Sequence, residues 1–349
     1  MPKTAVIILI WNGMKYLPDC LGSIINQDYP KDSREFIIVD NASNDGAAEY
    51  VKKNYPEFTV IENDRNYGFD KGNNIGMKYA LDKGYDYIVL LNQDTAVEPN
   101  WLSELVKAAE SDKKIGGVQS LMLHFNDKEM INSVGNQLHF LGFGFCEGNR
   151  KKLGEQELRI KDITYASSAS VLYRASVLKE AGCFDEEFFL YHEDTDLSFK
   201  IKMAGYRIVI ASKSVMFHNY EFSRSIKKYY YMERNRYRIL LTYLKLPTLI
   251  LISPAFVVME CGMWLFALRG GWAKEKLRSC AYILNKKNLA DIFKKRRYIQ
   301  RTRKLNDREF TKNFVGEIMY QEIDNPLLRH IANPIFKIYW ALARMIIYW

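Results

Sequence analysis

The chain has 349 residues, 48% of them hydrophobic and 26% charged, which suffices for one large domain or two and excludes a disordered or collagen-like chain. Residues 1–220 carry 25 basic and 31 acidic side chains (net −6), whereas residues 221–349 carry 25 basic and 10 acidic ones (net +15). Five widely spaced cysteines without a CxxC pair argue against a disulfide framework or a zinc site and favour a reducing compartment. We therefore expect chemistry in the first region and an anionic binding surface in the second.

Strands and helices alternate along the first region. The apolar run at 5–11 is only seven residues long, so it predicts a buried parallel strand rather than a signal peptide. Further strands are predicted at 35–40, 59–62, 87–92 and 116–119, with helices at 18–27, 47–54 and 71–83. This alternation predicts an α/β fold with a doubly wound, mostly parallel sheet.

The pattern changes after residue 120. Residues 121–159 are irregular and glycine-rich, which predicts hairpins or a loop over the sheet. A helix at 195–204 and strands at 207–210 and 215–218 then complete a catalytic domain that we place at 1–220. Residues 221–349 are predicted to form a separate helical region, basic and rich in aromatic side chains.

Polar side chains stand where predicted strands end: Trp11, Asp40 and the triplet Asn92, Gln93 and Asp94. Ligands of open α/β sheets bind beyond the carboxyl ends of the strands. A carboxylate there can accept the ring N–H of a pyrimidine base, and another can hold Mg²⁺ or Mn²⁺ against phosphate oxygens. Asp40 and Asp94 are candidates for these tasks, the alternative being that each caps a turn or helix.

Six short motifs follow one another in a fixed order, at 8–12, 23–30, 38–46, 66–74, 90–95 and 192–194. This ordered set resembles the glycosyltransferase family 2 enzymes of GT-A fold, most closely the branch that contains rhamnosyltransferases. The resemblance runs from about residue 5 to residue 218, and more loosely to about residue 303. It implies a GT-A type sheet and a nucleotide-sugar donor.

The resemblance also implies roles for individual residues. Asp40 would bind the pyrimidine base, Asp94 and His218 would bind the divalent cation, and a structural role is the alternative for His218. The donor site would further contain Trp11, Lys71, Asn73, Asn74, Asn92 and Gln93. The triplet at 92–94 takes the place of the family's DxD motif, with Asn92 where many members have Asp, and its form Leu-Asn-x-Asp-Thr looks like the branch that uses dTDP-rhamnose.

The pair Glu193 and Asp194 matches the family's acceptor-side motif. Inverting transfer needs a carboxylate that takes the proton of the acceptor hydroxyl while a cation stabilises the departing diphosphate. Asp194 fits the base, Glu193 would orient the acceptor or tune its neighbour, and Asp196 is the second choice for the base. The alternative, that these acids stabilise a helix N-terminus, is compatible with both roles.

The apolar segment 246–268 is long enough to span a bilayer, but Pro254 is expected to divide it into two pieces too short to span singly. Basic residues flank it, and residues 286–304 are densely basic. We expect in-plane or re-entrant attachment to the inner face of the cell membrane, the alternatives being a single span or a buried helix of a soluble domain. Nucleic-acid binding is not expected, because no nucleic-acid module precedes the basic run.

These observations predict an inverting, metal-dependent glycosyltransferase that moves a sugar, L-rhamnose from dTDP-rhamnose by preference, to a glycan or lipid-linked acceptor in cell-surface polysaccharide assembly. One alternative keeps the fold and uses a UDP-sugar with a hexose, N-acetylhexosamine or galactofuranose. The other alternative is a non-catalytic subunit that binds a nucleotide sugar. The Gln-x-x-Arg-Trp motif of processive synthases does not occur in the sequence, so we expect addition of one sugar or a few.

Overall fold

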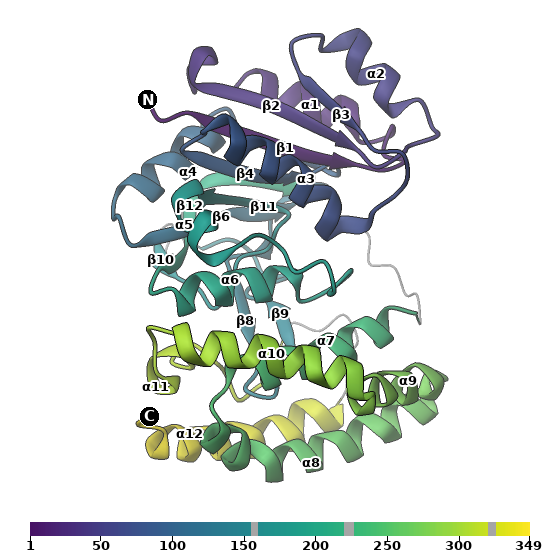
Figure 1. Ribbon diagram of the computed structural model, residues 1–349, viewed down its shortest axis with the longest axis vertical. Helices are drawn as coiled ribbons and strands as arrows, with labels where there is room; N and C mark the ends of the chain where they lie inside the picture. The colour runs from purple at the N-terminus through teal and green to yellow at the C-terminus, as the bar shows by residue number, and fades with distance from the viewer. Residues whose placement is uncertain (155–159, 220–226, 320–325) are drawn as a thin grey trace.

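The computed structural model describes residues 1–154, 160–219, 227–319 and 326–349. A sheet with helices on both faces forms one end of the molecule, and a group of helices from the last third of the chain forms the other end (Figure 1). The mixed α/β architecture and the helical C-terminal region confirm the predicted fold class.

The main sheet has the strand order β10-β12-β6-β11-β4-β1-β2-β3. β1 pairs in parallel with β2 and β4, β2 with β3, and β6 with β12, whereas β11 runs antiparallel between β4 and β6. Two short strands lie outside this order, β5 paired with β12 and β7 paired with β6, while β8 and β9 form a separate hairpin. The bounds are β1 Thr4–Ile10, β2 Arg34–Asp40, β3 Thr59–Glu62, β4 Tyr87–Asn92, β5 Thr95–Val97, β6 Ile115–His124, β7 Asp127–Ser133, β8 Asn136–Leu138, β9 Gly144–Cys146, β10 Lys161–Asp162, β11 Ser170–Arg174 and β12 Arg207–His218.

Helices cover both faces of this sheet, so its central strands are apolar on both sides. In β1, Val6 and Ile8 pack against α1 (Leu17–Ile25), α2 (Ala47–Asn54) and α4 (Trp101–Glu110). Ala5 and Ile7 face the opposite core with α3 (Gly68–Lys83), α5 (Ala175–Ala181) and α6 (Glu193–Met203). Helix α3 approaches the sheet closely, because a Cβ at Gly76 would lie 2.7 Å from the Ile7 side chain.

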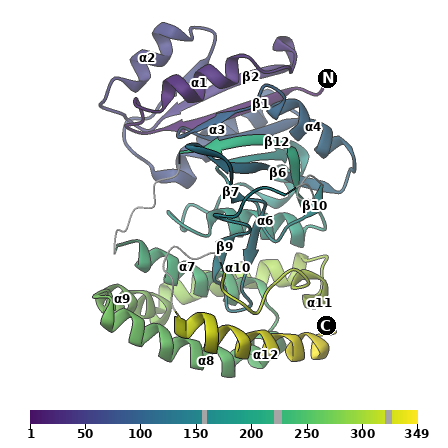
Figure 2. The same cartoon turned by 180° about the vertical axis from the view of Figure 1, so that it is seen from behind.

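The C-terminal helices share a third core with α6 and the β8–β9 hairpin. Phe199 of α6 packs edge-on against Tyr243 and Phe310, and Phe140 stacks on Trp340 with ring centroids 4.9 Å apart. Helix α6 therefore lies between the sheet and the helical region, as both views show (Figures 1 and 2). The remaining helices are η1 Lys31–Ser33, α7 Lys227–Tyr243, α8 Leu246–Arg269, α9 Ala273–Leu284, α10 Lys286–Thr302, α11 Asp307–Phe310, η3 Leu328–Ala332 and α12 Asn333–Ile346.

Two predicted strand boundaries were wrong. The hairpins predicted for 121–159 are present as β6–β7 and β8–β9, but β6 extends beyond the predicted end at 119 to His124; residues 155–159 lie outside the described residues. The predicted strands at 207–210 and 215–218 are one strand, β12, whose pairing with β6 shifts register between Ala211 and Val215. That irregularity explains why the sequence pattern looked interrupted.

The prediction that Pro254 divides the apolar segment was also wrong, because α8 is continuous from Leu246 to Arg269. Proline cannot donate to the carbonyl four residues earlier, that of Ile250. The Ser253 hydroxyl donates to this carbonyl instead, at 2.8 Å. Within the described part of the chain, α8 is the one helix with the length and apolar composition to cross a membrane.

Candidate active site

The carboxyl ends of β1, β2 and β4 meet at one edge of the sheet. In the strand register, Ile10 lies opposite Asp40 and Leu9 opposite Asn92. The Asp40 carboxylate is buried and accepts hydrogen bonds from the Ser43 backbone N–H (3.2 Å) and from the Ser43 hydroxyl (2.5 Å). These bonds fix the carboxylate at the strand end, so Asp40 also stabilises the turn that follows it.

The loop after β1 is tied to the triplet at 92–94 by the Gln93 side chain. The Trp11 N–H donates to Gln93 Oε1 at 2.9 Å, and Gln93 Nε2 donates back to the Trp11 carbonyl at 3.3 Å. A Cβ at position 13 would lie 2.1 Å from Gln93 Oε1, so this amide position requires Gly13. The half-exposed Trp11 indole, Asn92 and Gln93 are thereby brought to the same edge as Asp40.

The three predicted donor-site residues of α3 have different surroundings. Lys71 Nζ lies 4.1 Å from the centroid of the Tyr67 ring. Asn73 is buried and donates to the Phe69 carbonyl of its own helix at 3.0 Å. Asn74 exchanges hydrogen bonds with the backbone of Phe184, both at 3.0 Å, so its amide supports the segment that leads to α6.

Asp94 and His218 lie together, because β5 pairs antiparallel with β12 and places His218 opposite Thr95. Asp94 Oδ1 is 3.6 Å from His218 Nε2. The other ring nitrogen, Nδ1, is 3.0 Å from Asn132 Oδ1, so this contact orients the ring with Nε2 toward Asp94. A carboxylate and an imidazole so arranged fit a divalent cation such as Mn²⁺.

A cation held by Asp94 and His218 would need further ligands. Among residues 1–154, 160–219, 227–319 and 326–349, no group of three or more His, Cys, Asp or Glu side chains is placed to hold a metal ion. Phosphate oxygens and water are suitable additional ligands for a hard cation.

The backbone is strained just before the pair Glu193 and Asp194. Left-handed conformations of non-glycine residues cost of order 1 kcal/mol each and gather at functional sites. Three of them precede α6 directly, at Phe189, Tyr191 and His192, with φ of +63°, +63° and +66°. This geometry could not be predicted from residue type, because none of the three residues is glycine or asparagine.

Two side chains of α7 hold the strained segment in place. Asn235 Nδ2 donates to the carbonyls of Phe188, Leu190 and Tyr191 at 3.1, 2.9 and 2.7 Å. Arg234 Nη2 donates to the carbonyls of Glu187 and Phe188 at 2.6 and 2.7 Å. The helical region thereby fixes the approach to the acidic pair.

The Asp194 and Glu193 carboxyl groups are packed among protein atoms but keep some accessible surface. Burial raises the pKa of Asp194 to about 6, although the Thr195 N–H, 2.7 Å from Oδ1, favours the charged form. Burial, and then the charges of Asp194 and Asp70, raise the pKa of Glu193 well above its ordinary value. Asp194 is suited to act as a base near neutral pH, and the protonated form of Glu193 is favoured over its charged form more than in a solvated glutamate.

Asp196, the second choice for the base, is engaged elsewhere. The Tyr243 hydroxyl of α7 donates to its Oδ1 at 2.6 Å, and Lys200 Nζ lies 3.0 Å from its Oδ2. The Tyr243 contact ties α6 to α7, the Lys200 contact lies within α6, and together they give Asp196 a structural role.

A fourth acidic residue, Asp70 of α3, was missed by the sequence analysis. Both of its carboxylate oxygens are buried without a hydrogen-bond partner among the described residues. Burial, and then the charges of Asp185, Asp196 and Asp194, raise its pKa to about 8. Its position inside the motif at 66–74 was the available signal.

The acidic pair and the strand-end residues are joined by the turn before β11. The Asn92 N–H donates to the Ala169 carbonyl at 2.9 Å, and the backbone N–H of the neighbouring Ser168 favours the charged form of Asp194. On the same turn, the Ala166 N–H donates to Ser198 Oγ of α6 at 3.1 Å. The proposed base is thus attached to the edge that carries the predicted donor-site residues.

Residues 5–182, half of the chain, match the family profile described as Glycosyl transferase family 2. The chain belongs to this family. The family that the resemblance predicted is thereby confirmed.

Its curated relatives include the poly-β-1,6-N-acetyl-D-glucosamine synthases of Staphylococcus epidermidis and Staphylococcus aureus, 23% and 24% identical over 205 and 204 residues. These alignments cover 58% of this chain and 46% of each relative, so the chain spans about half the length of the curated relatives it matches.

Solved structures show the same GT-A fold. Residues 1–349 of Staphylococcus aureus TarS align over 98% of this chain and 90% of that one, with a TM-score of 0.54 and 18% identity. GalNAc-T7 with UDP, GalNAc and Mn²⁺ aligns over 69% of this chain and 50% of that one (TM-score 0.54, 19% identity). A Pyrobaculum calidifontis mannosyltransferase with GDP-Man and Mn²⁺ aligns over 86% and 85% (TM-score 0.51, 16% identity).

Proposed function

We propose that this protein is an inverting, cation-dependent glycosyltransferase that moves a sugar from a pyrimidine nucleoside diphosphate to a hydroxyl of a glycan or lipid-linked acceptor in cell-surface polysaccharide assembly. The observation that carries this proposal is the pairing of two features at one sheet edge. One is the carboxylate–imidazole pair Asp94 and His218, and the other is the buried carboxylate Asp194 with its pKa raised to about 6.

In the proposed reaction, Asp40 accepts the ring N–H of the base, and Trp11, Lys71, Asn92 and Gln93 surround the rest of the donor, with Asn73 and Asn74 supporting α3 beside it. Asp94 and His218 would hold Mn²⁺ or Mg²⁺, which stabilises the charge that grows on the leaving diphosphate.

Asp194 takes the proton of the acceptor hydroxyl as this oxygen attacks the anomeric carbon from the face opposite the leaving group, which inverts the configuration. Glu193, whose pKa is raised well above its ordinary value, donates a hydrogen bond to the acceptor in its protonated form and keeps it in line. The structure supports this division of roles, since burial acts differently on the two neighbouring carboxyl groups.

For the donor we propose dTDP-rhamnose, on the Leu-Asn-x-Asp-Thr form of residues 91–95. A UDP-N-acetylhexosamine is the second candidate, because the curated relatives are named for an N-acetylglucosamine polymer and GalNAc-T7 was solved with UDP and GalNAc.

We also propose that the enzyme attaches to the cytoplasmic face of the membrane through an apolar face made by α8 and α12. This face consists of side chains that are more than half exposed: Leu246, Ile250, Val257, Val258, Leu265 and Leu268 of α8, with Ile335, Ile338, Leu342, Met345 and Ile346 of α12. The two helices lie side by side at the end of the molecule farthest from the sheet (Figures 1 and 2). Exposed Arg269, Lys274 and Arg278 near it suit anionic headgroups.

The donor assignment is tested by thermal unfolding with dTDP, UDP, GDP and their sugars, each with and without Mn²⁺. A ligand at about a hundredfold its Kd stabilises the fold by about 2.7 kcal/mol. We expect the largest Mn²⁺-dependent shift with dTDP-rhamnose, and loss of the Mn²⁺ dependence in Asp94→Ala. A larger shift with a UDP-sugar would replace the donor, and no shift with any nucleotide would contradict the proposed enzyme.

A further inference from the structure

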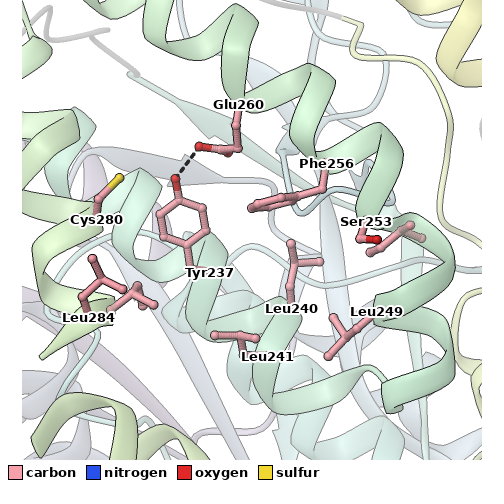
Figure 3. Close-up of a pocket in the computed structure, with 11 residues that line it drawn as sticks. Tyr237, Leu240, Leu241, Leu249, Ser253, Phe256, Glu260, Cys280 and Leu284 are labelled. Atoms are coloured by element: carbon pink, nitrogen blue, oxygen red, sulfur yellow. Dashed lines mark hydrogen bonds between the residues drawn. The ribbon is translucent and has the colours of Figure 1, made fainter. Parts of the chain in front are cut away.

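A cavity of about 450 Å³ lies between α7, α8 and α9, away from the strand-end site (Figure 3). This volume falls within the range of about 300–1,000 Å³ of small-molecule sites. Its walls are apolar side chains from all three helices: Leu240 and Leu241 of α7, Leu249 and Phe256 of α8, and Ile283 and Leu284 of α9.

The polar groups at one end of the cavity are already paired. The Tyr237 hydroxyl donates to Glu260 at 2.7 Å, and Lys276 Nζ donates to that hydroxyl at 2.9 Å and to Glu260 at 2.7 Å. Glu233 and Arg236 complete a network of two acids and two bases. Because these charges balance, the cavity offers no unpaired charge for an ionic ligand and suits an apolar occupant.

The cavity and the apolar face of α8 and α12 share helix α8. Leu249 and Phe256 line the cavity, while the residues that follow them, Ile250 and Val257, are 63% and 60% exposed on the apolar face. Leu284 lines the cavity and is also 79% exposed. A hydrocarbon chain could pass from a membrane at this face into the cavity without crossing water.

Helix α7 connects the cavity with the catalytic segment. Arg234 and Asn235 hold the strained residues before Glu193, and Tyr237, in the same helical turn, lines the cavity. An occupant of the cavity and an acceptor at Asp194 would therefore be positioned by the same helix.

We infer that this cavity binds the hydrocarbon chain of a lipid-linked acceptor while its sugar end reaches Asp194. The inference rests on the proposed function and adds where the lipid part of the substrate is held. The cavity would then select acceptors with a long chain over soluble glycans of the same sugar.

The direct test is photo-crosslinking of the full chain with a single-sugar glycolipid whose hexadecyl chain ends in a diazirine, followed by peptide mapping. We expect adducts on the cavity peptides of α7 and α9, competed by the unlabelled glycolipid and not by its butyl analogue. Adducts spread over the apolar face would overturn the proposal. Equal competition by a dihexadecyl phospholipid would assign the cavity to bulk lipid and overturn the acceptor role.

Two variants of α9 give a matched comparison. Ile283→Trp fills the cavity, whereas Leu277→Trp adds the same ring at a 61% exposed position that does not line it. We expect labelling of the cavity peptides to fall about tenfold in Ile283→Trp only; equal labelling in both variants would contradict the proposal. The Mn²⁺-dependent thermal shift with nucleotides is a separate readout of the proposed function. If the unaltered protein showed no such shift, the proposed function would be refuted, but the labelling result would still report on the cavity.

Discussion

Asp70, Glu193 and Asp194 are three carboxyl groups within electrostatic reach of one another, buried between α3 and the start of α6. Burial and mutual repulsion both disfavour their charged forms, so the pKa of each is raised. A carboxylate with a pKa of about 6 is a stronger base than a solvated one and is still ionised at neutral pH. The same burial and repulsion that disfavour the charged forms therefore make Asp194 a better base in the role we propose for it.

Transfer should depend on pH through Asp194. The base works only when deprotonated, so kcat/KM should rise with pH and level off above the pKa of about 6. The measurement is kcat/KM from about pH 5 to about pH 8 with saturating Mn²⁺. A rate that is constant across this window would contradict the assignment.

Asp70 should lower the stability of the fold at neutral and alkaline pH. Its folded-state pKa of about 8 exceeds the ordinary 3.8, so the folded state binds the proton more tightly and stability falls as the pH rises between these values. Asp70→Asn, which resembles the protonated form, should raise the Tm increasingly from about pH 5 to about pH 9, by a few kcal/mol of unfolding free energy at most, since one pKa unit is about 1.4 kcal/mol. A difference in Tm that does not vary with pH would show that Asp70 is not the titrating group.

At the scale of elements, α7 and α8 show where predictions from short sequence motifs were incomplete or wrong. The motif at 192–194 identified the acidic pair, but the contacts that shape it come from α7, more than forty residues later. Pro254 is a strong local signal for a break, yet one hydroxyl, that of Ser253, satisfies the freed carbonyl. Single-residue rules failed where a distant or neighbouring side chain supplied the missing hydrogen bond.

Asn235 should matter more for turnover than for donor binding. Asn235→Ala removes the contacts of one NH₂ group with three carbonyls of the strained segment; its two N–H donors are worth about 1 kcal/mol each, so we expect lower stability and a lower kcat. The donor-induced thermal shift should persist, because strand ends place Asp40, Asp94 and His218, whereas Asn235 holds the segment before α6. Asn288→Ala on α10, which removes one bond to the Tyr282 carbonyl of α9, is the control. An unchanged kcat in Asn235→Ala would show that the hydrogen bonds of Asn235 stabilise the fold without affecting turnover.

At the scale of the whole molecule, the site residues at strand ends were predictable, and their partners were not. Asp40, Asn92 and Asp94 could be placed because parallel strands end at a common edge, and that edge is observed. Asn132 approaches His218 across 86 residues and Asn74 reaches Phe184 across 110, through pairings that only the complete sheet defines. The pairing of segments that are distant in the sequence could not be predicted from the sequence alone.

The sheet, whose strand ends carry the predicted donor site, lies at one end of the molecule, and α8 and α12, which form the apolar face, lie at the other end (Figure 1). We expect Val258→Glu with Leu342→Glu to weaken binding to anionic phospholipid vesicles by about tenfold or more, since each buried aliphatic side chain contributes about 2 kcal/mol. Lys53→Glu on α2, far from this face, is the charge-matched control. Equal vesicle binding of both variants would rule out the membrane role of α8 and α12.

The most direct test of the proposed function is the transfer rate of Asp194→Asn, measured with the donor that gives the largest thermal shift. Asp82→Asn, an exposed acid at the far end of α3, is the matched control. We expect Asp194→Asn to lose about 10²- to 10⁴-fold in kcat, the usual contribution of a general base, with the nucleotide-induced thermal shift retained. Unimpaired transfer by Asp194→Asn would contradict the mechanism proposed for this family 2 glycosyltransferase.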